Sequence, residues 1–347
     1  MTAFARRRLL TGALGAGGAV LAGVFLGGTA EGATVEGATV EGATVEGATP
    51  AATNKNTFGA PVHRLGTADP GVLDVDGVWY CYSTSGSSTG AIPIRRSTDG
   101  GATWSDVGRV FPIDGLPTWV TGPKRFWAPE VHAFGGGYVI YYASDGPQRW
   151  FCVGAATADH PEGPWTDLGN PLVSRPDYSV IDPSFFVDPT TGRSYLLWKN
   201  NTNALTPPRP TALVLQEVTA DGLTLVGTAT DLLFNTLEWE GKVVEAPSLI
   251  FHKGWYYLFY SGNNFGNASY AVGVARSRYI DRGYVKHGDP ILASDDVLDG
   301  PGGQFPMPDG NNGWQMFFHA RERSNPSAGR QLWWTRLKFH DDWPVVA

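Results

Sequence analysis

The stretch Val243-Val244-Glu245-Ala246-Pro247-Ser248-Leu249-Ile250 decides the fold of this chain. It leads directly into a Gly turn and an aromatic run that ends in Ser, Phe251-His252-Lys253-Gly254-Trp255-Tyr256-Tyr257-Leu258-Phe259-Tyr260-Ser261. A carboxylate, a proline, a short apolar run, a turn and a second apolar run together predict a β-hairpin with an acid at its head.

Comparable hairpins begin at four other places, Asp69-Pro70, Pro129-Glu130, Asp182-Pro183 and Phe305-Pro306. The prolines at 70, 129, 183, 247 and 306 are separated by 59, 54, 64 and 59 residues. Each unit holds four β-type runs, and no segment after residue 60 shows helical periodicity. A double β-sandwich explains the strands but not the repeat. The sequence therefore predicts an all-β fold, a five-bladed β-propeller with four-stranded antiparallel blades.

The first residues predict export. Arg6-Arg7-Arg8 precedes a short Gly/Ala-rich apolar stretch, so residues 1–30 are interpreted as a twin-arginine-type signal peptide. A transmembrane anchor is the weaker interpretation, because the stretch is short and weakly hydrophobic. Residues 31–56 are interpreted as a low-complexity linker of EGATV repeats, and residues 57–347 as the propeller. We expect a secreted, extracellular protein without stable membrane association after signal cleavage.

Charge and composition limit the partners. The net charge is −7, and Lys and Arg are scattered singly, which argues against a nucleic-acid partner. A neutral, polar polysaccharide or oligosaccharide is more natural, and we expect a monomer. The two cysteines, Cys81 and Cys152, lie in different repeats. Two buried free thiols are the favoured state, although the sequence leaves a disulfide open.

Three acids are expected to converge. The first strand of each propeller blade lines the central channel, so Asp69, Asp182 and Glu245 should meet at one mouth within roughly 10 Å of each other. Three carboxylates in a closed cavity repel one another, which is costly unless they are used. Glycoside hydrolysis needs such a set, since one acid protonates the leaving oxygen and one carboxylate activates water. A third carboxylate can keep the acid protonated near neutral pH.

The chain resembles the family-43 glycoside hydrolases, five-bladed propellers that include arabinanases, α-L-arabinofuranosidases and β-xylosidases. The resemblance rests on these segments: Ala68-Asp69-Pro70, Phe126-Trp127-Ala128-Pro129-Glu130-Val131, Ile181-Asp182-Pro183-Ser184, Glu245-Ala246-Pro247-Ser248, Phe318-His319-Ala320 and Asp342-Trp343-Pro344-Val345. It implies that Asp69 is the general base, Glu245 the general acid and Asp182 the residue that tunes the acid. It also implies that Trp127, Glu130 and His319 lie at the sugar site.

One segment departs from the family pattern. Many members carry Gly-Pro-Gly-His in the last blade, with the His reaching a metal ion, whereas this chain has Gly300-Pro301-Gly302-Gly303-Gln304. The missing His puts a channel calcium in doubt. His319 matches a different motif position, which a strand histidine satisfied by its neighbours explains at least as well as metal ligation does. We therefore expect that no cofactor is required.

Three other activities fit the sequence less well. A retaining fructan-type propeller would need Asn-Asp-Pro-Asn and Arg-Asp-Pro motifs, which are absent. A sialidase is suggested only by one Asp-box pattern from Ser97 to Trp104, better explained as a hairpin turn. A non-catalytic carbohydrate-binding propeller would not need three acids. The expected function is a secreted inverting hydrolase of arabinan or arabinoxylan, with α-L-arabinofuranosyl linkages favoured over β-xylosyl ones. Residues 112–124 and 200–211 are expected to decide exo against endo action.

Overall fold

The protein is seen here in a computed structural model, which describes residues 61–347 apart from 65, 85–89, 123–124 and 147–148. The expected signal peptide and the expected linker, residues 1–56, lie outside the described residues. No helix within the described ranges is long and apolar enough to cross a membrane.

The described part of the chain forms five four-stranded antiparallel sheets, each built from four consecutive strands. Blade 1 contains β1 (Gly71–Val75), β2 (Val78–Tyr82), β3 (Gly90–Ser97) and β4 (Ser105–Pro112). Blade 2 contains β5 (Trp127–Phe134), β6 (Gly137–Asp145), β7 (Phe151–Ala158) and β8 (Thr166–Asp167). Blade 3 contains β9 (Val180–Val187), β10 (Ser194–Asn200), β11 (Ala212–Val218) and β12 (Leu225–Phe234).

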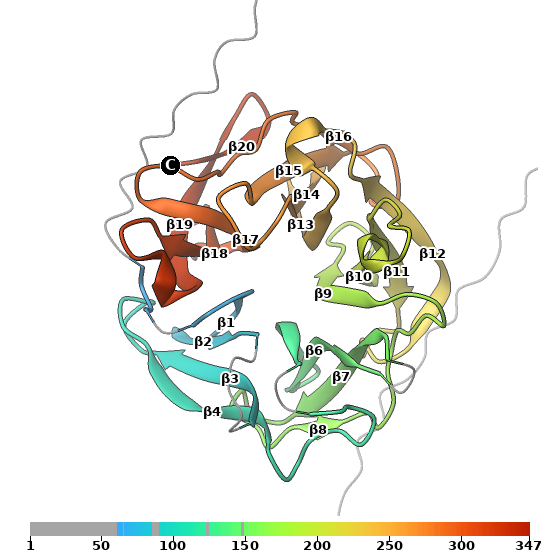
Figure 1. Ribbon diagram of the computed structural model, residues 1–347. Helices are drawn as coiled ribbons and strands as arrows, with labels where there is room; N and C mark the ends of the chain where they lie inside the picture. The colour runs from blue at the N-terminus through green and yellow to red at the C-terminus, as the bar shows by residue number, and fades with distance from the viewer. Residues whose placement is uncertain (1–60, 65, 85–89, 123–124, 147–148) are drawn as a thin grey trace, which may run out of the picture. The chain divides into compact units, whose positions relative to one another are not determined.

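Blade 4 contains β13 (Val244–His252), β14 (Trp255–Gly262), β15 (Ala271–Ser277) and β16 (Val285–Lys286). Blade 5 contains β17 (Leu298–Pro308), β18 (Trp314–Glu322), β19 (Gln331–His340) and β20 (Trp343–Val346). Figure 1 shows the blades following one another around a ring, with β1, β9, β13 and β17 toward its centre. The predicted five-bladed propeller with four-stranded antiparallel blades is confirmed.

Two outer strands lie elsewhere than predicted. The sequence alone predicts the fourth strands of blades 2 and 4 near Leu172 and at Ile291-Leu292. In the structure these strands are β8 and β16, which have two residues each and lie a few residues earlier in the chain. The predicted segments contribute single bridges instead, Val153 with Val173 and Val272 with Leu292. Proline has no N–H to donate to a ladder, and Pro171 and Pro290 interrupt both outer segments.

Each inner strand carries one extra residue at the same place. In β5, Trp127 pairs with Ala143 and Glu130 with Tyr141, so three steps on the inner strand oppose two on its neighbour. The same register shift occurs in β9, β13 and β17. In blade 1, Thr84 N–H donates to Ala68 O at 2.9 Å and Gly71 pairs with Tyr82. Three steps on the inner segment again oppose two on its neighbour. These β-bulges bend each inner strand where it faces the channel.

The bulge residues share a left-handed backbone. Their φ angles are 51°, 42°, 55°, 51° and 57° for, in chain order, Asp69, Ala128, Asp182, Ala246 and Gly303. This region is uncommon for residues that carry a Cβ atom. A proline follows the first four bulge residues, and Gln304 follows the fifth. Pro306 was therefore the wrong fifth marker, because it lies two residues beyond the position equivalent to the other prolines.

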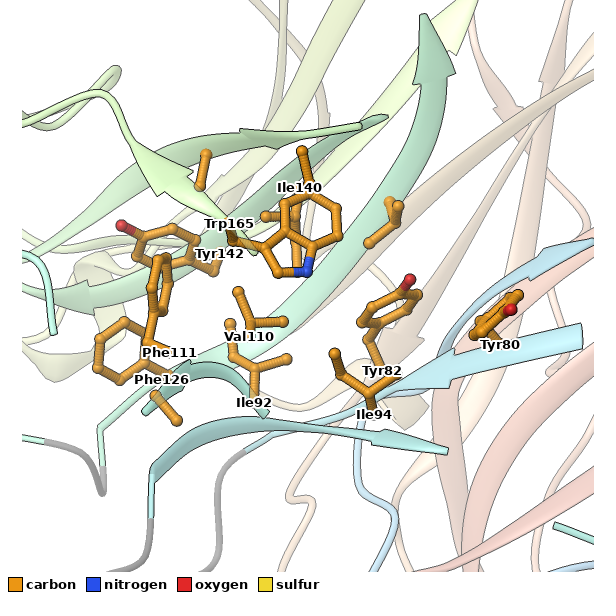
Figure 2. Close-up of a cluster of buried hydrophobic side chains, with 14 of the residues drawn as sticks. Tyr80, Tyr82, Ile92, Ile94, Val110, Phe111, Phe126, Ile140, Tyr142 and Trp165 are labelled. Atoms are coloured by element: carbon orange, nitrogen blue, oxygen red, sulfur yellow. The ribbon is translucent and has the colours of Figure 1, made fainter. Parts of the chain in front are cut away.

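Apolar clusters join neighbouring blades at all five junctions. The cluster between blades 1 and 2 contains Tyr82 and Ile94 from blade 1 and Ile140 and Tyr142 from blade 2, as Figure 2 shows. Tyr142 contacts Phe126 with ring centroids 5.2 Å apart. Corresponding clusters lie between the other pairs of blades, including blades 5 and 1. The core is thus divided among the blade junctions, so each inner strand is held from both sides.

The ring closes through the segment before Asp69. Val62 N–H donates to Leu332 O at 2.9 Å, and Thr67 N–H donates to Arg330 O at 2.9 Å. These bonds tie the start of the described chain to blade 5, next to the bulge of blade 1.

The Ser97 to Trp104 segment is a hairpin turn between β3 and β4, in which Asp99 accepts hydrogen bonds from Thr103. Both cysteines are buried free thiols, as favoured from the sequence.

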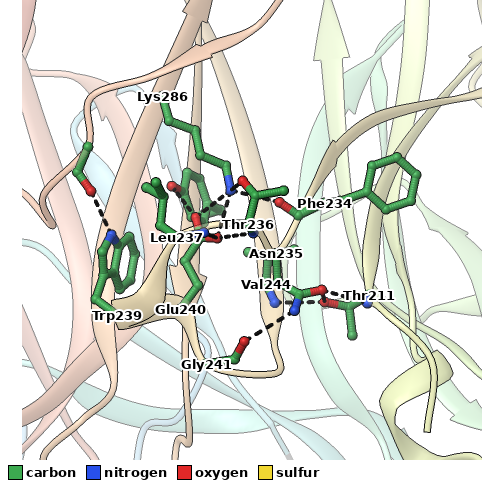
Figure 3. A network of polar contacts seen from close by, with 12 residues as sticks. Thr211, Phe234, Asn235, Thr236, Leu237, Trp239, Glu240, Gly241, Val244 and Lys286 are labelled. Carbon is green, nitrogen blue, oxygen red and sulfur yellow. Dashed lines mark hydrogen bonds and ion pairs between the residues drawn. The ribbon is translucent and has the colours of Figure 1, made fainter.

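A buried ion pair fixes the connection that leads into β13. Glu240, in the turn η2 (Glu238–Glu240), is fully buried and accepts bonds from Lys286 Nζ at 2.6 and 2.7 Å and from Tyr260 OH at 2.7 Å. Its Oε2 also accepts the N–H groups of Thr236 and Leu237, and the network is drawn in Figure 3. Glu240 itself lies only a few residues before Glu245 in the chain.

Removing the Glu240 carboxylate should therefore be costly. Glu240→Ala leaves the part-buried Lys286 without its counter-ion and removes the acceptor of two backbone N–H groups, so we expect the free energy of unfolding to fall by about 3–5 kcal/mol. Urea unfolding followed by circular dichroism measures this change. Glu238→Ala, an exposed carboxylate in the same turn, is the control and should change stability by less than about 0.5 kcal/mol. Equal losses for the two variants would contradict the structural role of the ion pair.

Candidate active site

The five bulges surround one pocket at an end of the channel. It holds about 320 Å³ of empty space, counted to its open mouth. Its lining residues come from all five blades: Asp69, Pro70, Ala128, Pro129, Glu130, Asp182, Pro183, Ala246, Pro247, Gly303, Gln304 and Phe305. Five equivalent bulges thus bring two of the three predicted acids, Asp69 and Asp182, into one pocket, whereas Glu245 is not among its lining residues.

Glu245 occupies a different position from the other two acids. Asp69 and Asp182 are bulge residues, whereas the bulge residue of blade 4 is Ala246 and Glu245 precedes it by one residue. The expectation that all three acids share one strand position was therefore wrong for Glu245. The one-residue offset pairs Glu245 with Ser261 on β14 and turns its side chain toward blade 3 on one side and Tyr270 on the other.

Hydrogen bonds link the bulges from blade to blade. The N–H group of a bulge residue donates to a side chain of the preceding blade at four junctions. The donor and acceptor pairs are Asp69 with His319 Nδ1 at 3.0 Å, Ala128 with Thr84 Oγ1 at 3.0 Å, Ala246 with Asp182 Oδ2 at 2.9 Å and Gly303 with Ser261 Oγ at 3.0 Å. The positions of the pocket residues are therefore set by contacts between blades as well as within them.

Asp69 is held as a carboxylate. Thr84 accepts the Ala128 N–H, so its own hydroxyl hydrogen is free to donate to Asp69 Oδ2 at 2.5 Å. Arg330 Nη1 lies 3.3 Å from Asp69 Oδ1. Burial by itself raises the pKa of Asp69, but the Arg330 charge and these hydrogen bonds outweigh it and hold the pKa well below its usual range. The side chain is still 20% exposed, so one face remains open to the pocket.

His319 lies behind Asp69 and is completely buried. Burial, followed by the nearby Arg330 charge, lowers the pKa of His319, which favours the neutral ring. Its Nδ1 accepts the Asp69 N–H at 3.0 Å and so cannot also donate to the Asp69 carboxylate 3.3 Å away. Gly303 makes room for the ring, because a Cβ atom there would lie 2.5 Å from Nδ1. His319 thus supports the backbone of Asp69 and does not line the pocket.

Glu245 has two hydrogen-bond donors. Lys199 Nζ, on β10, lies 2.7 Å from Oε2, and Tyr270 OH lies 2.7 Å from Oε1. Burial raises the pKa of Tyr270 well above its usual range, so its hydroxyl keeps the hydrogen that it donates. The Glu245 side chain is 12% exposed. Its two oxygens are held by these donors, directly beside the lining residue Ala246.

Asp182 has a raised pKa. Burial, and next the negative charge of Glu245, raise the pKa of Asp182 to about 7, against the lowering effect of Lys199. Below that pH Asp182 carries a proton, whereas Asp69 is held ionised. This is the distribution of charge that acid–base hydrolysis of a glycoside requires.

Glu130 and Trp127 have different surroundings. Glu130 lines the pocket, but its Oε1 accepts Phe185 N–H at 2.8 Å and contacts His132 Nε2 at 2.6 Å, which joins blades 2 and 3. Trp127 lies just outside the lining residues and stacks on Phe151 with ring centroids 3.9 Å apart. Both were predicted to lie at the sugar site, and of the two only Glu130 lines the pocket.

The pocket residues do not fit a calcium ion. Gln304 lies where the family pattern suggests a metal-binding segment, and its amide donates to Ala246 O at 2.5 Å and accepts from Ser261 Oγ at 2.7 Å. Calcium prefers six to eight oxygen ligands, and both amide atoms of Gln304 are already used. Among the described residues, no group of three or more His, Cys, Asp and Glu side chains is placed to hold a metal ion.

Sequence reasoning missed several residues of the site. Lys199, Thr84, Tyr270 and Arg330 each donate to one of the acids, and Gln304 lines the pocket. The available signal was the single Lys at the end of the apolar run Leu196-Leu197-Trp198, where a charge is unexpected. Tyr270 and Arg330 lie just before β15 and β19, where strand periodicity gives no information.

Comparisons with known proteins agree with this geometry. The family model described as Glycosyl hydrolases family 43 matches residues 58–344. The arabinan endo-1,5-α-L-arabinosidase C of Emericella nidulans is 29% identical over 80% of this chain and 91% of its own length. Among solved structures, a thermostable family-43 glycoside hydrolase is 25% identical with a TM-score of 0.74, over 81% of this chain and 92% of that one. An endo-1,4-β-xylanase from Bacteroides thetaiotaomicron is 27% identical with a TM-score of 0.70, over 83% and 96%.

Proposed function

The chain belongs to glycosyl hydrolase family 43, and from that premise we propose that it hydrolyses the α-L-arabinofuranosyl linkages of arabinan. Membership makes the protein a glycoside hydrolase of plant polysaccharides, and the family generally inverts the anomeric configuration and needs no cofactor. Arabinan is favoured because the curated relative of Emericella nidulans carries that name. Xylan is the second candidate, since a similar solved structure is a xylanase.

One observation supports the roles of the acids. Asp69 is held ionised by Arg330 and Thr84, while burial and the neighbouring charge of Glu245 raise the pKa of Asp182 to about 7, so that Asp182 keeps a proton near Glu245. We propose that Asp69 is the general base that takes a proton from water. Glu245 is the general acid, since Lys199 and Tyr270 hold its carboxyl group beside the pocket residue Ala246 and near Asp182. Asp182 orients Ala246 and raises the proton affinity of the acid.

The reaction follows from these roles. The glycosidic oxygen takes the proton of Glu245 as its bond to the anomeric carbon breaks, and the bonding electrons stay with that oxygen. Water attacks the opposite face of the sugar and gives its proton to Asp69. Proton NMR of the first product anomer tests this order of events, and inversion is expected. Net retention would point to a covalent intermediate and contradict the role of Asp69 as a base.

The substrate is tested with a panel of polymers and aryl glycosides. We expect higher kcat/KM on linear arabinan than on branched arabinan, arabinoxylan or xylan, measured by reducing sugar release. Product chromatography separates endo from exo action, because endo cleavage first releases a range of oligosaccharides. Higher kcat/KM on xylan would replace arabinan with the second candidate. Treatment with EDTA should leave the activity unchanged, because we propose that no metal is required.

Asp182 should set the upper pH limit of activity. In Asp182→Asn the negative charge beside Glu245 is lost, so the proton of the acid is released at lower pH. We expect the basic limb of the profile of kcat/KM against pH, near pH 7 in the wild type, to move to lower pH. An unchanged basic limb in the folded variant would show that Asp182 does not tune the acid.

We also propose that the enzyme is exported and acts as a monomer. Export is supported by the Arg6-Arg7-Arg8 run and the apolar stretch that follows it. Replacing Arg7 and Arg8 with lysine should leave the protein inside the cells in a fractionation experiment. A monomer is supported by a pocket whose lining comes from all five blades of one chain, and size-exclusion chromatography measures it.

A further inference from the structure

A buried lysine lies beside the proposed acid. The Lys199 side chain is 2% exposed, and its Nζ is 2.7 Å from Glu245 Oε2. An ammonium group is costly to bury unless a partner compensates for its lost hydration. Lys199 pairs with Ile181 opposite the bulge of blade 3. The equivalent positions of the other blades are Thr84, Ala143, Ser261 and His319, and burial keeps the last of these neutral. The charge is thus specific to the blade that faces Glu245.

The lysine also changes the hydrogen bonding of its junction. Thr84, Ser261 and His319 each accept the N–H of the next bulge. An ammonium group has no acceptor, so Lys199 cannot do the same for Ala246, and Asp182 accepts that N–H instead. Because Lys199 cannot accept the Ala246 N–H, Asp182 accepts it across the junction between blades 3 and 4, and Glu245 binds the ammonium group.

We propose that Lys199 is a positioning residue for the general acid. Its ammonium holds the Glu245 carboxyl group and stabilises the negative charge that appears there when the proton passes to the glycosidic oxygen. The O–H bond of Glu245 breaks as the new O–H bond forms on the leaving group, and Lys199 itself keeps its protons. This inference rests on the proposed function, in which Glu245 is the acid.

Other charged groups near this pair act in known directions. Glu245 raises the pKa of Asp182, and Lys199 lowers it. Further away are Asp69, which also raises the pKa of Asp182, and His319, whose ring is neutral. Tyr270 donates to Glu245 as a neutral hydroxyl, and Arg330 is engaged by Asp69. Lys199 is thus the cation that directly opposes the two carboxylates, and its removal should have the opposite effect to removal of Asp182.

The test is Lys199→Met, which keeps an unbranched side chain and removes the charge. We expect the basic limb of kcat/KM against pH to move up by about one to three pH units. We also expect kcat on arabinan to fall by about 10²-fold. The loss should be smaller for an aryl arabinofuranoside with a good leaving group, which needs little protonation. A structural role alone would lower activity without raising the limb or depending on the leaving group.

Two controls complete the experiment. Lys286→Met removes an ammonium from another buried glutamate, Glu240, so it should lower stability without moving the basic limb. Lys199→Arg keeps the charge and should return the limb toward its wild-type position. A folded Lys199→Met variant with an unmoved or lowered limb overturns the inference. Glu245→Ala distinguishes failure of the inference about Lys199 from failure of the proposed function, because a fully active Glu245→Ala enzyme overturns the proposed function itself.

Discussion

Replacing Glu245 with alanine should lower kcat/KM on arabinan by about 10³-fold or more, because the leaving sugar then departs as an unprotonated alkoxide. The loss should shrink on aryl arabinofuranosides as the leaving group becomes more acidic, since a nitrophenolate leaves without a proton. Initial rates across a series of aryl substrates measure this dependence. Circular dichroism spectra and melting curves establish that the variant is folded.

The other donor to the glutamate provides a graded comparison. Tyr270→Phe removes one hydrogen bond from Glu245 and keeps the carboxyl group, so its effect should be much smaller than that of Glu245→Ala. A Glu245→Ala enzyme that loses the same factor on every leaving group would contradict its role as the acid. So would a variant with near wild-type activity on arabinan.

Asp69→Asn should be as damaging, but with a different pattern. Asparagine tolerates the left-handed backbone at this position, so the bulge with φ of 51° should persist. The amide cannot take a proton from water, and we expect kcat to fall by about 10³-fold or more on all substrates. The factor should be independent of the leaving group, because the base acts on water whatever sugar departs.

The kinetic measurement is the same aryl series, with arabinan as the polymer. A plot of activity lost against leaving-group acidity should be flat for Asp69→Asn and sloped for Glu245→Ala. If the two slopes were exchanged, the assignments of acid and base would be exchanged as well. Parallel melting curves guard against a general loss of fold.

The repeat made most of the fold accessible from the sequence. Four of the five inner strands contain or follow a left-handed bulge residue that is followed by proline. The strands beside them show alternation of apolar residues. The fifth copy uses Gly303 and Gln304, so the nearest proline, Pro306, gave a register two residues too long. Short outer strands were misplaced because a two-residue ladder leaves almost no periodic signal.

The site was less accessible for a physical reason. Asp69, Asp182 and Glu245 could be found because they belong to the repeated segments, although the one-residue offset of Glu245 could not. Lys199 and Arg330 meet their acids across blade junctions, over 46 and 261 residues of sequence. Such contacts depend on how the blades pack against one another, and a local sequence pattern carries no information about that packing. His319 was found through a family pattern, but only the three-dimensional contacts place it behind Asp69.

The five bulges also have a consequence for protein engineering. Ala128 and Ala246 hold the same backbone conformation as Asp69 and Asp182, and their Cβ atoms start at the same edge of the pocket. Aspartate and asparagine adopt this conformation more readily than alanine does. Ala128 and Ala246 are therefore positions at which a new reactive side chain can be introduced by a single codon change, without redesign of the main chain.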